Sequence, residues 1–284
     1  METLIVTQII NVLYGVAVLA MLAVGLAIVF GLLGVLNIAH GEFVMLGAYS
    51  AHFVDTMHWP FPAAFPIAVA LSAALGFVVE RWIIRPLYRR PFDTLVATWG
   101  VSLLMRKLTE ALFGPQYYNV SIPVSGAITI FGASYPAYRL LIILISLTLI
   151  GVLTLWYLRS RAGDRVRAMV GNPELAQAVG ISTRRLAAAT FVLGVCLASF
   201  GGVLIAPVVP VEPFMGVDYA LTEFFALVVG GLGSVAGLFA GAAIVGGLDS
   251  VVSALSDATD GYFAMLLVTI LFLWLRPRGL IARI

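Results

Sequence analysis

Charged residues are scarce in this chain. They make up 11% of its 284 residues, whereas 62% are hydrophobic, and the mean hydropathy is +1.07. A soluble domain usually carries about 25% charged residues and about 45–50% apolar residues. The composition therefore excludes a soluble globular protein and predicts one whose apolar surface faces lipid. Its apolar stretches run to about 20 residues without alternation, which favours membrane-crossing helices over a closed barrel.

Cysteine, lysine and histidine are also rare, and this narrows the possible chemistry. The single cysteine, Cys196, excludes an internal disulfide. The only lysine, Lys107, lies outside any phosphate-binding Gly-x-x-x-x-Gly-Lys motif, so we expect no nucleotide site in this chain. His40, His52 and His58 lack the spacing of metal ligands. Since no Ser/His or paired-Asp constellation is present either, we predict no enzyme, no cofactor, no metal and no nucleic-acid partner.

Basic residues are absent before Arg81 and then gather in three segments, residues 81–90, 159–185 and 276–283. Cytoplasmic loops of membrane proteins attract Lys and Arg. We therefore predict that these segments face the cytoplasm, with the N-terminus periplasmic and the C-terminus cytoplasmic. The first residues contain no basic region and no cleavage site, so no removable signal peptide is expected.

The apolar segments predict an all-α, polytopic membrane protein with seven crossing helices in a single transmembrane domain over residues 1–284. These helices are expected at residues 6–31, 40–55, 61–84, 94–112, 138–158, 187–208 and 262–276. The Gly-rich stretch 222–253 makes either two crossings or none, because its first part, 222–235, is shorter than the about 20 residues that a crossing needs. Glycines at 230, 231 and 233 interrupt it, which favours a broken or re-entrant helix pair.

The basic segment 159–186 contains signals for a short helix. Asn172 is a good N-cap, Pro173 suits the first helical position, Glu174 complements the helix dipole and Gly180 favours a stop. We predict a helix over about 173–179 that exposes an apolar side, formed by Leu175, Ala176 and Val179. Two interpretations stay open, an ordinary connecting loop and a docking surface for a soluble partner.

Residues 37–42, Asn-Ile-Ala-His-Gly-Glu, place an amide, an imidazole and a carboxylate close together at the membrane. Ionisable residues at such depth are rare and often functional. The alternative is structural: Asn37 and Glu42 could cap helix ends, with His40 hydrogen-bonded to a carbonyl. Glycine-interrupted apolar segments occur in both halves of the chain, at residues 30–34 and 230–241. Such segments point to a substrate path in transporters; the alternative is close helix packing through small residues, and the two roles are compatible.

Arg106 and Lys107 follow a short apolar stretch. We expect both side chains to reach the outer interface, with Glu110 one turn later as a partner. A second possibility is that they face an anionic group of a substrate.

Four stretches together resemble one family of transporters. Residues 25–49 contain Gly-Val-Leu-Asn-Ile-Ala-His-Gly-Glu, Arg167 and Ala168 precede Gly180 and Ile181, residues 229–237 read Val-Gly-Gly-Leu-Gly-Ser-Val-Ala-Gly, and residues 276–280 read Arg-Pro-Arg-Gly-Leu. This pattern is similar to that of the permeases of branched-chain amino acid ABC importers, the smaller LivH-type permease in particular. The resemblance covers nearly the whole chain.

The resemblance implies a pore subunit of the bacterial inner membrane. Its expected partners are membrane lipid, a second homologous permease in a heterodimer, two cytoplasmic ATPase subunits that bind the ATP, and a periplasmic substrate-binding protein. Alternating access would carry branched-chain or other hydrophobic amino acids; urea, short amides and aromatic acids are alternative cargoes, and an ion-coupled secondary transporter is a further alternative. A coupling helix is implied within 164–181, with these residues: Arg165, Arg167, Asn172, Pro173, Glu174, Leu175 and Gly180. The implied substrate path has these residues: Asn37, His40, Gly41, Glu42, Gly230, Gly231, Gly233 and Ser234.

Overall fold

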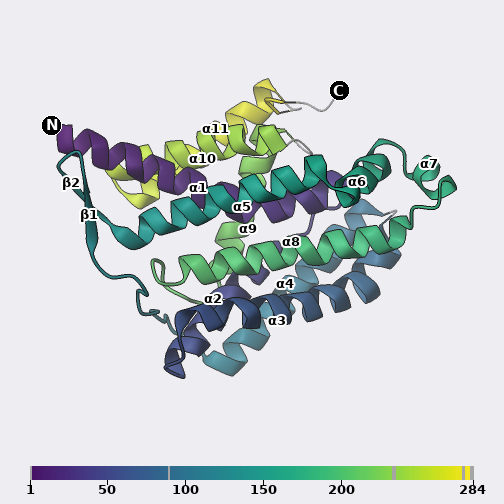
Figure 1. Cartoon of the computed structure of the whole chain (residues 1–284), viewed down its shortest axis with the longest axis horizontal. Helices are drawn as coiled ribbons and strands as arrows, with labels where there is room; N and C mark the ends of the chain where they lie inside the picture. Colours follow the sequence, from purple (N-terminus) through teal and green to yellow (C-terminus); the bar gives the residue numbers. More distant parts are fainter. Residues whose placement is uncertain (1, 89, 232–234, 277–278, 282–284) are drawn as a thin grey trace.

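The computed structural model describes all residues except 1, 89, 232–234, 277–278 and 282–284. The regular secondary structure of the described residues is helical apart from one hairpin, which confirms the predicted all-α, polytopic class (Figure 1). The first half contains α1 (Glu2–Leu33), α2 (His40–Thr56), η1 (Phe61–Ala63), α3 (Ala64–Val79), η2 (Glu80–Ile84), η3 (Arg85–Leu87), α4 (Pro91–Phe113), β1 (Ala127–Ile130) and β2 (Ala133–Pro136). The second half contains α5 (Ala137–Arg159), α6 (Arg161–Gly171), α7 (Pro173–Ala178), α8 (Thr183–Ile205), α9 (Met215–Gly230), α10 (Val235–Leu255) and α11 (Ala258–Leu275).

Six described helical segments are long and apolar enough to cross a membrane. They are Thr3–Leu33, Phe61–Leu87, Ala137–Arg159, Thr183–Ile205, Ala236–Leu255 and Ala258–Leu275. Two segments expected to cross, 40–55 and 94–112, form α2 and α4 and are not among the six. Helix α2 has only 17 residues, most of them buried in the protein, and α4 carries four charged side chains, at 93, 106, 107 and 110.

Helix α8 lies at the centre of the fold and packs against α1, α2 and α3. Glycines allow the close approach of these helices. A Cβ at Gly47 of α2 would lie 1.9 Å from the carbonyl oxygen of Ser199, and one at Gly202 of α8 would lie 2.0 Å from that of Val44. Small residues at such crossings let the two backbones meet, which is how helices associate in lipid. Helix α10 forms a second group with α1, α9 and α11.

The connections differ from expectation in three places. Residues 113–137, which no predicted helix covers, contain the antiparallel β1–β2 hairpin, in which Ala127 pairs with Pro136. Residues 159–186 contain α6 as well as the predicted short helix, here α7. The first helix of the Gly-rich stretch begins earlier than expected, because α9 starts at Met215. It ends at Gly230, where the predicted interruption lies.

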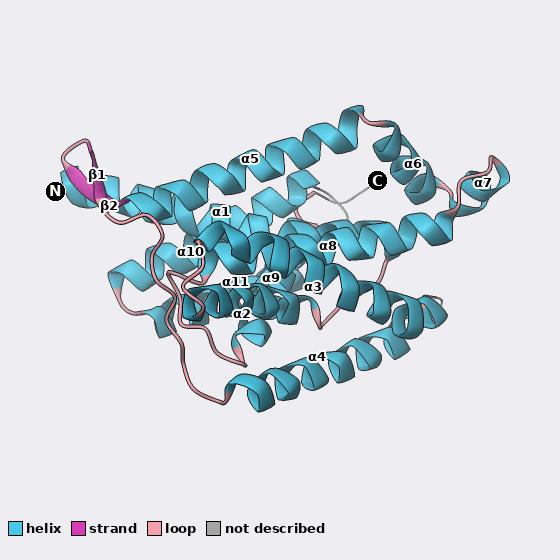
Figure 2. Cartoon of the chain, turned by 60° about the horizontal axis from the view of Figure 1, so that its bottom comes forward, coloured by secondary structure: helices cyan, strands magenta, loops and turns pink. Residues whose placement is uncertain are grey.

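The two ends of the helix bundle differ in character. Figure 1 shows the N-terminus and the β1–β2 hairpin at one end, and α6 and α7 at the opposite end. Figure 2 shows α4 along one edge of the molecule, where it packs against η2, η3 and α2. This edge position leaves one side of α4 exposed, while its other side meets the turn between α1 and α2.

Candidate functional site

The turn between α1 and α2 is shaped by glycine and asparagine. Helix α1 ends before Gly34, whose φ of 63° favours glycine. Asn37 then accepts a hydrogen bond through its Oδ1 from the backbone N–H of Ala39 at 3.1 Å. The Asn37 side chain therefore closes a turn just before α2, but the N-cap of α2 is Ala39, which has no side-chain capping hydrogen bond, so Asn37 does not cap this helix. Its Nδ2 is buried and has no partner among the described residues.

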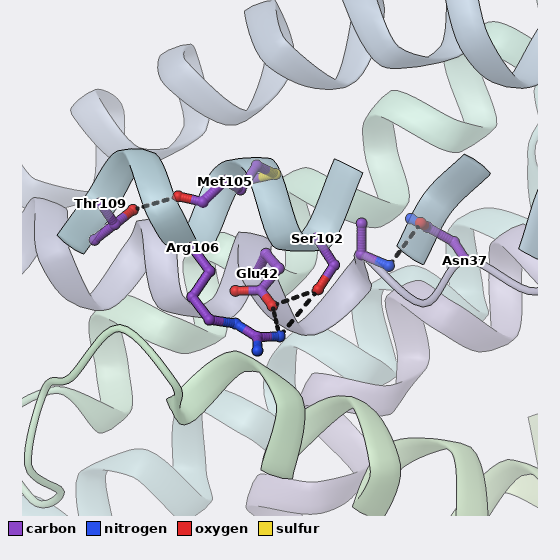
Figure 3. A network of polar contacts seen from close by, with 7 residues as sticks. Asn37, Glu42, Ser102, Met105, Arg106 and Thr109 are labelled. Carbon is purple, nitrogen blue, oxygen red and sulfur yellow. Dashed lines mark hydrogen bonds and ion pairs between the residues drawn. The ribbon is translucent and has the colours of Figure 1, made fainter. Parts of the chain in front are cut away.

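Glu42 forms an ion pair and caps no helix end. Figure 3 shows its carboxylate beside Ser102 and Arg106, both on α4. The Ser102 hydroxyl donates to Glu42 Oε1 at 2.7 Å, and Arg106 Nη2 donates to the same oxygen at 3.1 Å and to Ser102 Oγ at 3.2 Å. Glu42 is 1% exposed and Arg106 is 12% exposed. The pair therefore joins α2 to α4 within the protein, and charge-assisted hydrogen bonds of this kind are among the stronger ones.

The expectation that Arg106 and Lys107 share one environment is wrong. Lys107 is 66% exposed and pairs with Glu110 at 2.6 Å, as predicted. Arg106 turns the other way, towards Glu42, and its Cζ lies 5.2 Å from the ring centroid of Phe214. Two adjacent residues on a helix point about 100° apart, because one turn takes 3.6 residues. These two cations are adjacent in sequence but therefore lie in different environments.

His40 contacts a carboxylate of another helix. Its Nε2 lies 3.5 Å from Glu223 Oε2, and both side chains are fully buried. Glu223 belongs to α9, so this contact joins α2 to α9. Gly41 lets the same helices meet, because a Cβ at this position would lie 1.8 Å from the carbonyl oxygen of Gly216. The residues Asn37, His40, Glu42, Ser102, Arg106 and Glu223 are called the polar cluster below.

A cavity of about 330 Å³ lies beside the polar cluster. Its polar lining comes from Asn37, Ser102 and Arg106. The remaining wall is apolar and aromatic and consists of Leu26, Leu36, Ile38, Leu95, Trp99, Val217, Ala220, Leu221 and Phe224. Ligand sites combine such walls with a few polar groups, and their volumes range over about 300–1,000 Å³.

The glycine-broken segment lies apart from this cavity. Gly230 packs against Gly237, where a Cβ would lie 1.9 Å from the Gly237 carbonyl oxygen, and Gly231 has a φ of 112°. The backbone N–H groups of Leu280 and Ile281 donate to the carbonyls of Val229 and Gly230, each at 3.0 Å. None of these residues lines the cavity beside the polar cluster. Gly233 and Ser234 lie outside the described residues.

The α6–α7 segment matches the predicted capping. Asn172 Oδ1 accepts from the backbone N–H of Leu175 at 2.9 Å, Pro173 begins α7, and Gly180 follows it with a φ of 85°. Leu175 and Val179 are 62% and 68% exposed, as expected, but Ala176 is buried, so the predicted apolar side is narrower. Arg167 does not border it: this side chain pairs with Asp164 at 2.5 Å and donates to the carbonyl of Tyr157 in α5.

Two members of the polar cluster were not assigned to a site from the sequence, Ser102 and Glu223. The sequence did contain a reason to expect partners for the charged residues of these helices. Glu42 and Arg106 are opposite charges in apolar segments, and each such charge in a membrane protein needs a partner. The same rule predicts a partner for His40 and for Glu223, but it does not specify which helix supplies that partner.

Known proteins resemble this chain along most of its length. It is 28% identical to the high-affinity branched-chain amino acid transport system permease protein LivH of Salmonella typhimurium, over 93% of this chain and 91% of that protein. It is 28% identical to BraD of Pseudomonas aeruginosa, over 97% and 95% of the two chains, and 27% identical to LivM of Escherichia coli, over 92% and 67%. LivM and BraD are likewise described as high-affinity branched-chain amino acid transport system permease proteins.

A solved structure, PsaBC from Streptococcus pneumoniae in complex with Fab, has a similar fold. The TM-score is 0.51 at 12% identity, with 93% of this chain and 89% of that chain covered. The profile of the family described as the branched-chain amino acid transport system / permease component matches residues 8–275. The chain is therefore a multi-pass membrane permease that belongs to this family, and it is a transport subunit with no catalytic activity of its own.

Proposed function

We propose that this chain forms one half of the pore of an ATP-driven importer for branched-chain or other hydrophobic amino acids, and that it works by alternating access. The observation that carries this proposal is the polar cluster beside an otherwise apolar cavity. A transporter for hydrophobic molecules needs a path that is apolar along most of its wall and polar at a few points. Ionisable side chains buried in a membrane protein mark such paths.

The proposed orientation places the α6–α7 end in the cytoplasm. Arginines gather on that segment, and the β1–β2 hairpin lies at the opposite end with the N-terminus (Figure 1). The positive-inside rule then puts the hairpin in the periplasm. In this orientation α11 would run towards the cytoplasmic side, and Arg276 follows its last residue, Leu275.

The proposed partners follow from the same orientation. The exposed Leu175 and Val179 at the tip of the α6–α7 segment would contact an ATPase subunit, and the hairpin end would receive a substrate-binding protein. The likeness to both LivH and LivM supports pairing with a second permease. In this arrangement ATP is bound by the ATPases, and this chain transmits their closure to the helices around the cavity.

Reconstitution in liposomes tests the proposal. Vesicles that hold this chain with a partner permease, two ATPases and a substrate-binding protein should take up radiolabelled leucine only when ATP is supplied to the ATPase side. Vesicles that hold this chain alone should take up none. Leucine uptake by the chain alone, driven by a proton or sodium gradient, would favour an ion-coupled transporter and overturn the proposal.

A further inference from the structure

The packing of α5 against the rest of the bundle stops before the helix ends. The buried residues of α5 recur every four residues and form one stripe, Tyr138, Ile142, Ser146 and Ile150. Residues 151–159, the remainder of the helix, are all at least partly exposed. Figures 1 and 2 show α5 diverging from α8 towards the end where α6 joins α5. The last part of α5 therefore leaves a gap between itself and the bundle.

A narrow cavity of about 80 Å³ lies in this gap. Helices α1, α5, α6 and α8 all contribute to its wall, which is almost entirely apolar and includes Ile28, Leu153, Val166 and Leu193. Sites for whole small molecules are larger, about 300–1,000 Å³. An acyl chain is a single row of methylene groups, so part of one chain fits a cavity of this size.

The cavity lies close to one face of the membrane. Helices α1, α5 and α8 are long and apolar enough to cross, and the cavity is lined by residues near the ends of the first two. Leu32 is the last residue but one of α1, and Trp156 and Tyr157 lie in the last turn of α5. Trp and Tyr are enriched at the membrane–water interface. At this depth acyl chains are available to fill an apolar gap, and burying apolar surface against them is favourable.

Two arginines lie next to residues that line the cavity. Arg159 follows Trp156 by three residues, so the two side chains are neighbours on the helix surface. Arg159 is exposed and forms no ion pair within the described part of the chain. Arg167 has its Cζ 5.3 Å from the ring centroid of Tyr157 and is paired with Asp164. The guanidinium of Arg159 therefore remains available for a phosphate, a group that arginine binds well.

From these features we propose that the cavity binds one acyl chain of an anionic phospholipid, whose phosphate lies against Arg159. The apolar wall selects for the chain, and the unpaired arginine selects for the negative charge of the headgroup. A helix of a second permease is about 10 Å across with its side chains and is too thick for this cavity. The proposal goes beyond the transport function and applies at either face of the membrane, because it depends only on depth and charge.

Tryptophan fluorescence tests the site, because Trp156 lines the cavity. The purified full-length permease is placed in phosphatidylcholine nanodiscs with Trp156 as its only tryptophan. The other four are exposed, so their replacement by Phe should disturb packing little: Trp59, Trp82, Trp99 and Trp274. Phospholipids with brominated acyl chains quench a tryptophan that they contact. Brominated phosphatidylglycerol should quench Trp156 as strongly as an about fivefold higher fraction of brominated phosphatidylcholine, which corresponds to the attraction between one arginine and an anionic membrane surface.

A second reporter position and two pairs of variants assign the effect to the cavity. Leu147→Trp, combined with Trp156→Phe, places the reporter on the exposed surface of the same helix, where both lipids should quench equally. Arg159→Gln should abolish the preference for phosphatidylglycerol at Trp156, whereas Arg81→Gln, which removes an exposed arginine from η2, should not. Thr154→Phe fills the cavity and should also abolish the preference, whereas Thr154→Val should preserve it. Thermal unfolding of each variant verifies that it is folded.

Several outcomes would overturn the proposal. Equal quenching of Trp156 by the two lipids, or an unchanged preference in Arg159→Gln or Thr154→Phe, would show that no anionic lipid occupies the cavity. A preference of the same size at Leu147→Trp would show only a general attraction of anionic lipid to the protein. A Trp156 that neither lipid quenches would show that protein or water covers the cavity. Leucine uptake is not part of this experiment, so a failure of uptake in liposomes would overturn the proposed transport function and leave the lipid site standing.

Discussion

The polar cluster and the α6–α7 segment both carry charge, but their surroundings are opposite. In the cluster Glu42, His40 and Glu223 are almost fully enclosed, and the contacts Glu42–Arg106 and His40–Glu223 each join two different helices. In the α6–α7 segment the contacts join residues that are near in sequence: Arg167 pairs with Asp164 and donates to the carbonyl of Tyr157 at the end of α5, and Asn172 caps the helix that follows it. Breaking a contact should therefore loosen helix packing in the first region and only local helix structure in the second.

Removing Glu42 should have the largest effect. Glu42→Ala leaves Arg106 without its partner, and breaking a buried ion pair from one side costs about 3–5 kcal/mol. We expect a clear drop in the midpoint of thermal unfolding of the purified permease. Glu110→Ala, which removes the partner of the exposed Lys107, is the control and should change the midpoint little. Similar drops in both variants would contradict the difference between the two environments.

A methyl group at Gly41 should have the next largest effect. Gly41→Ala would place a Cβ against the Gly216 backbone, and overpacking of this kind typically costs about 1–3 kcal/mol. The matched control is Gly100→Ala on α4, where no atom lies within 4 Å of the added Cβ. That variant should be slightly more stable, because alanine is favoured over glycine in helices by about 0.5–1 kcal/mol. Thermal unfolding midpoints that shift in the same direction for both variants would show that α2 and α9 do not meet closely at Gly41.

The cap at Asn172 should matter less to stability and more to transport. Asn172→Ala removes a cap that contributes about 1 kcal/mol to α7, so the helix should fray. ATP-driven uptake in liposomes should fall while the unfolding midpoint of the bundle stays the same. Ser182→Ala is the control, because the Ser182 side chain makes no capping hydrogen bond before α8. A loss of uptake in both variants would point to the loop as a whole and not to the cap.

The smallest effect is expected at Lys107. Exposed ion pairs contribute about 0.2–1 kcal/mol and are screened by salt. Lys107→Gln should therefore shift the unfolding midpoint only slightly at low ionic strength and not at all in concentrated salt. A shift as large as that of Glu42→Ala would show that Lys107 is buried in the assembled transporter.

Much of the fold was predictable because its signals are local. Seven helices were placed from runs of apolar residues, and α7 was placed from Asn172, Pro173 and Gly180, whose effects act within one turn. Helix α6 was missed because its polar sequence carries no long apolar run. The β1–β2 hairpin was missed because its short strands lie among prolines and glycines that predict a loop.

The site was predictable only in part. Residues 37–42 were identified because ionisable groups at membrane depth are conspicuous. Their partners Ser102, Arg106 and Glu223 lie far away in the sequence, and no local pattern specifies which helices become neighbours. Gly230 and Gly231, predicted to share the path with residues 37–42, lie outside the cavity's lining, because a glycine pair that packs helices together has the same sequence signature as one that opens a path.

The contact between residues 279–281 and the end of α9 has a consequence for biosynthesis. The carbonyls of Val229 and Gly230 lie at the end of α9, where a helix supplies no N–H donor of its own, and they accept hydrogen bonds from the N–H groups of Leu280 and Ile281. During synthesis these two carbonyls lack these donors until α10, α11 and the residues after them have been made. The chain therefore reaches its final arrangement only after both later helices have been made and packed, and a fusion that pulls residues 279–281 away would leave these two carbonyls without their donors.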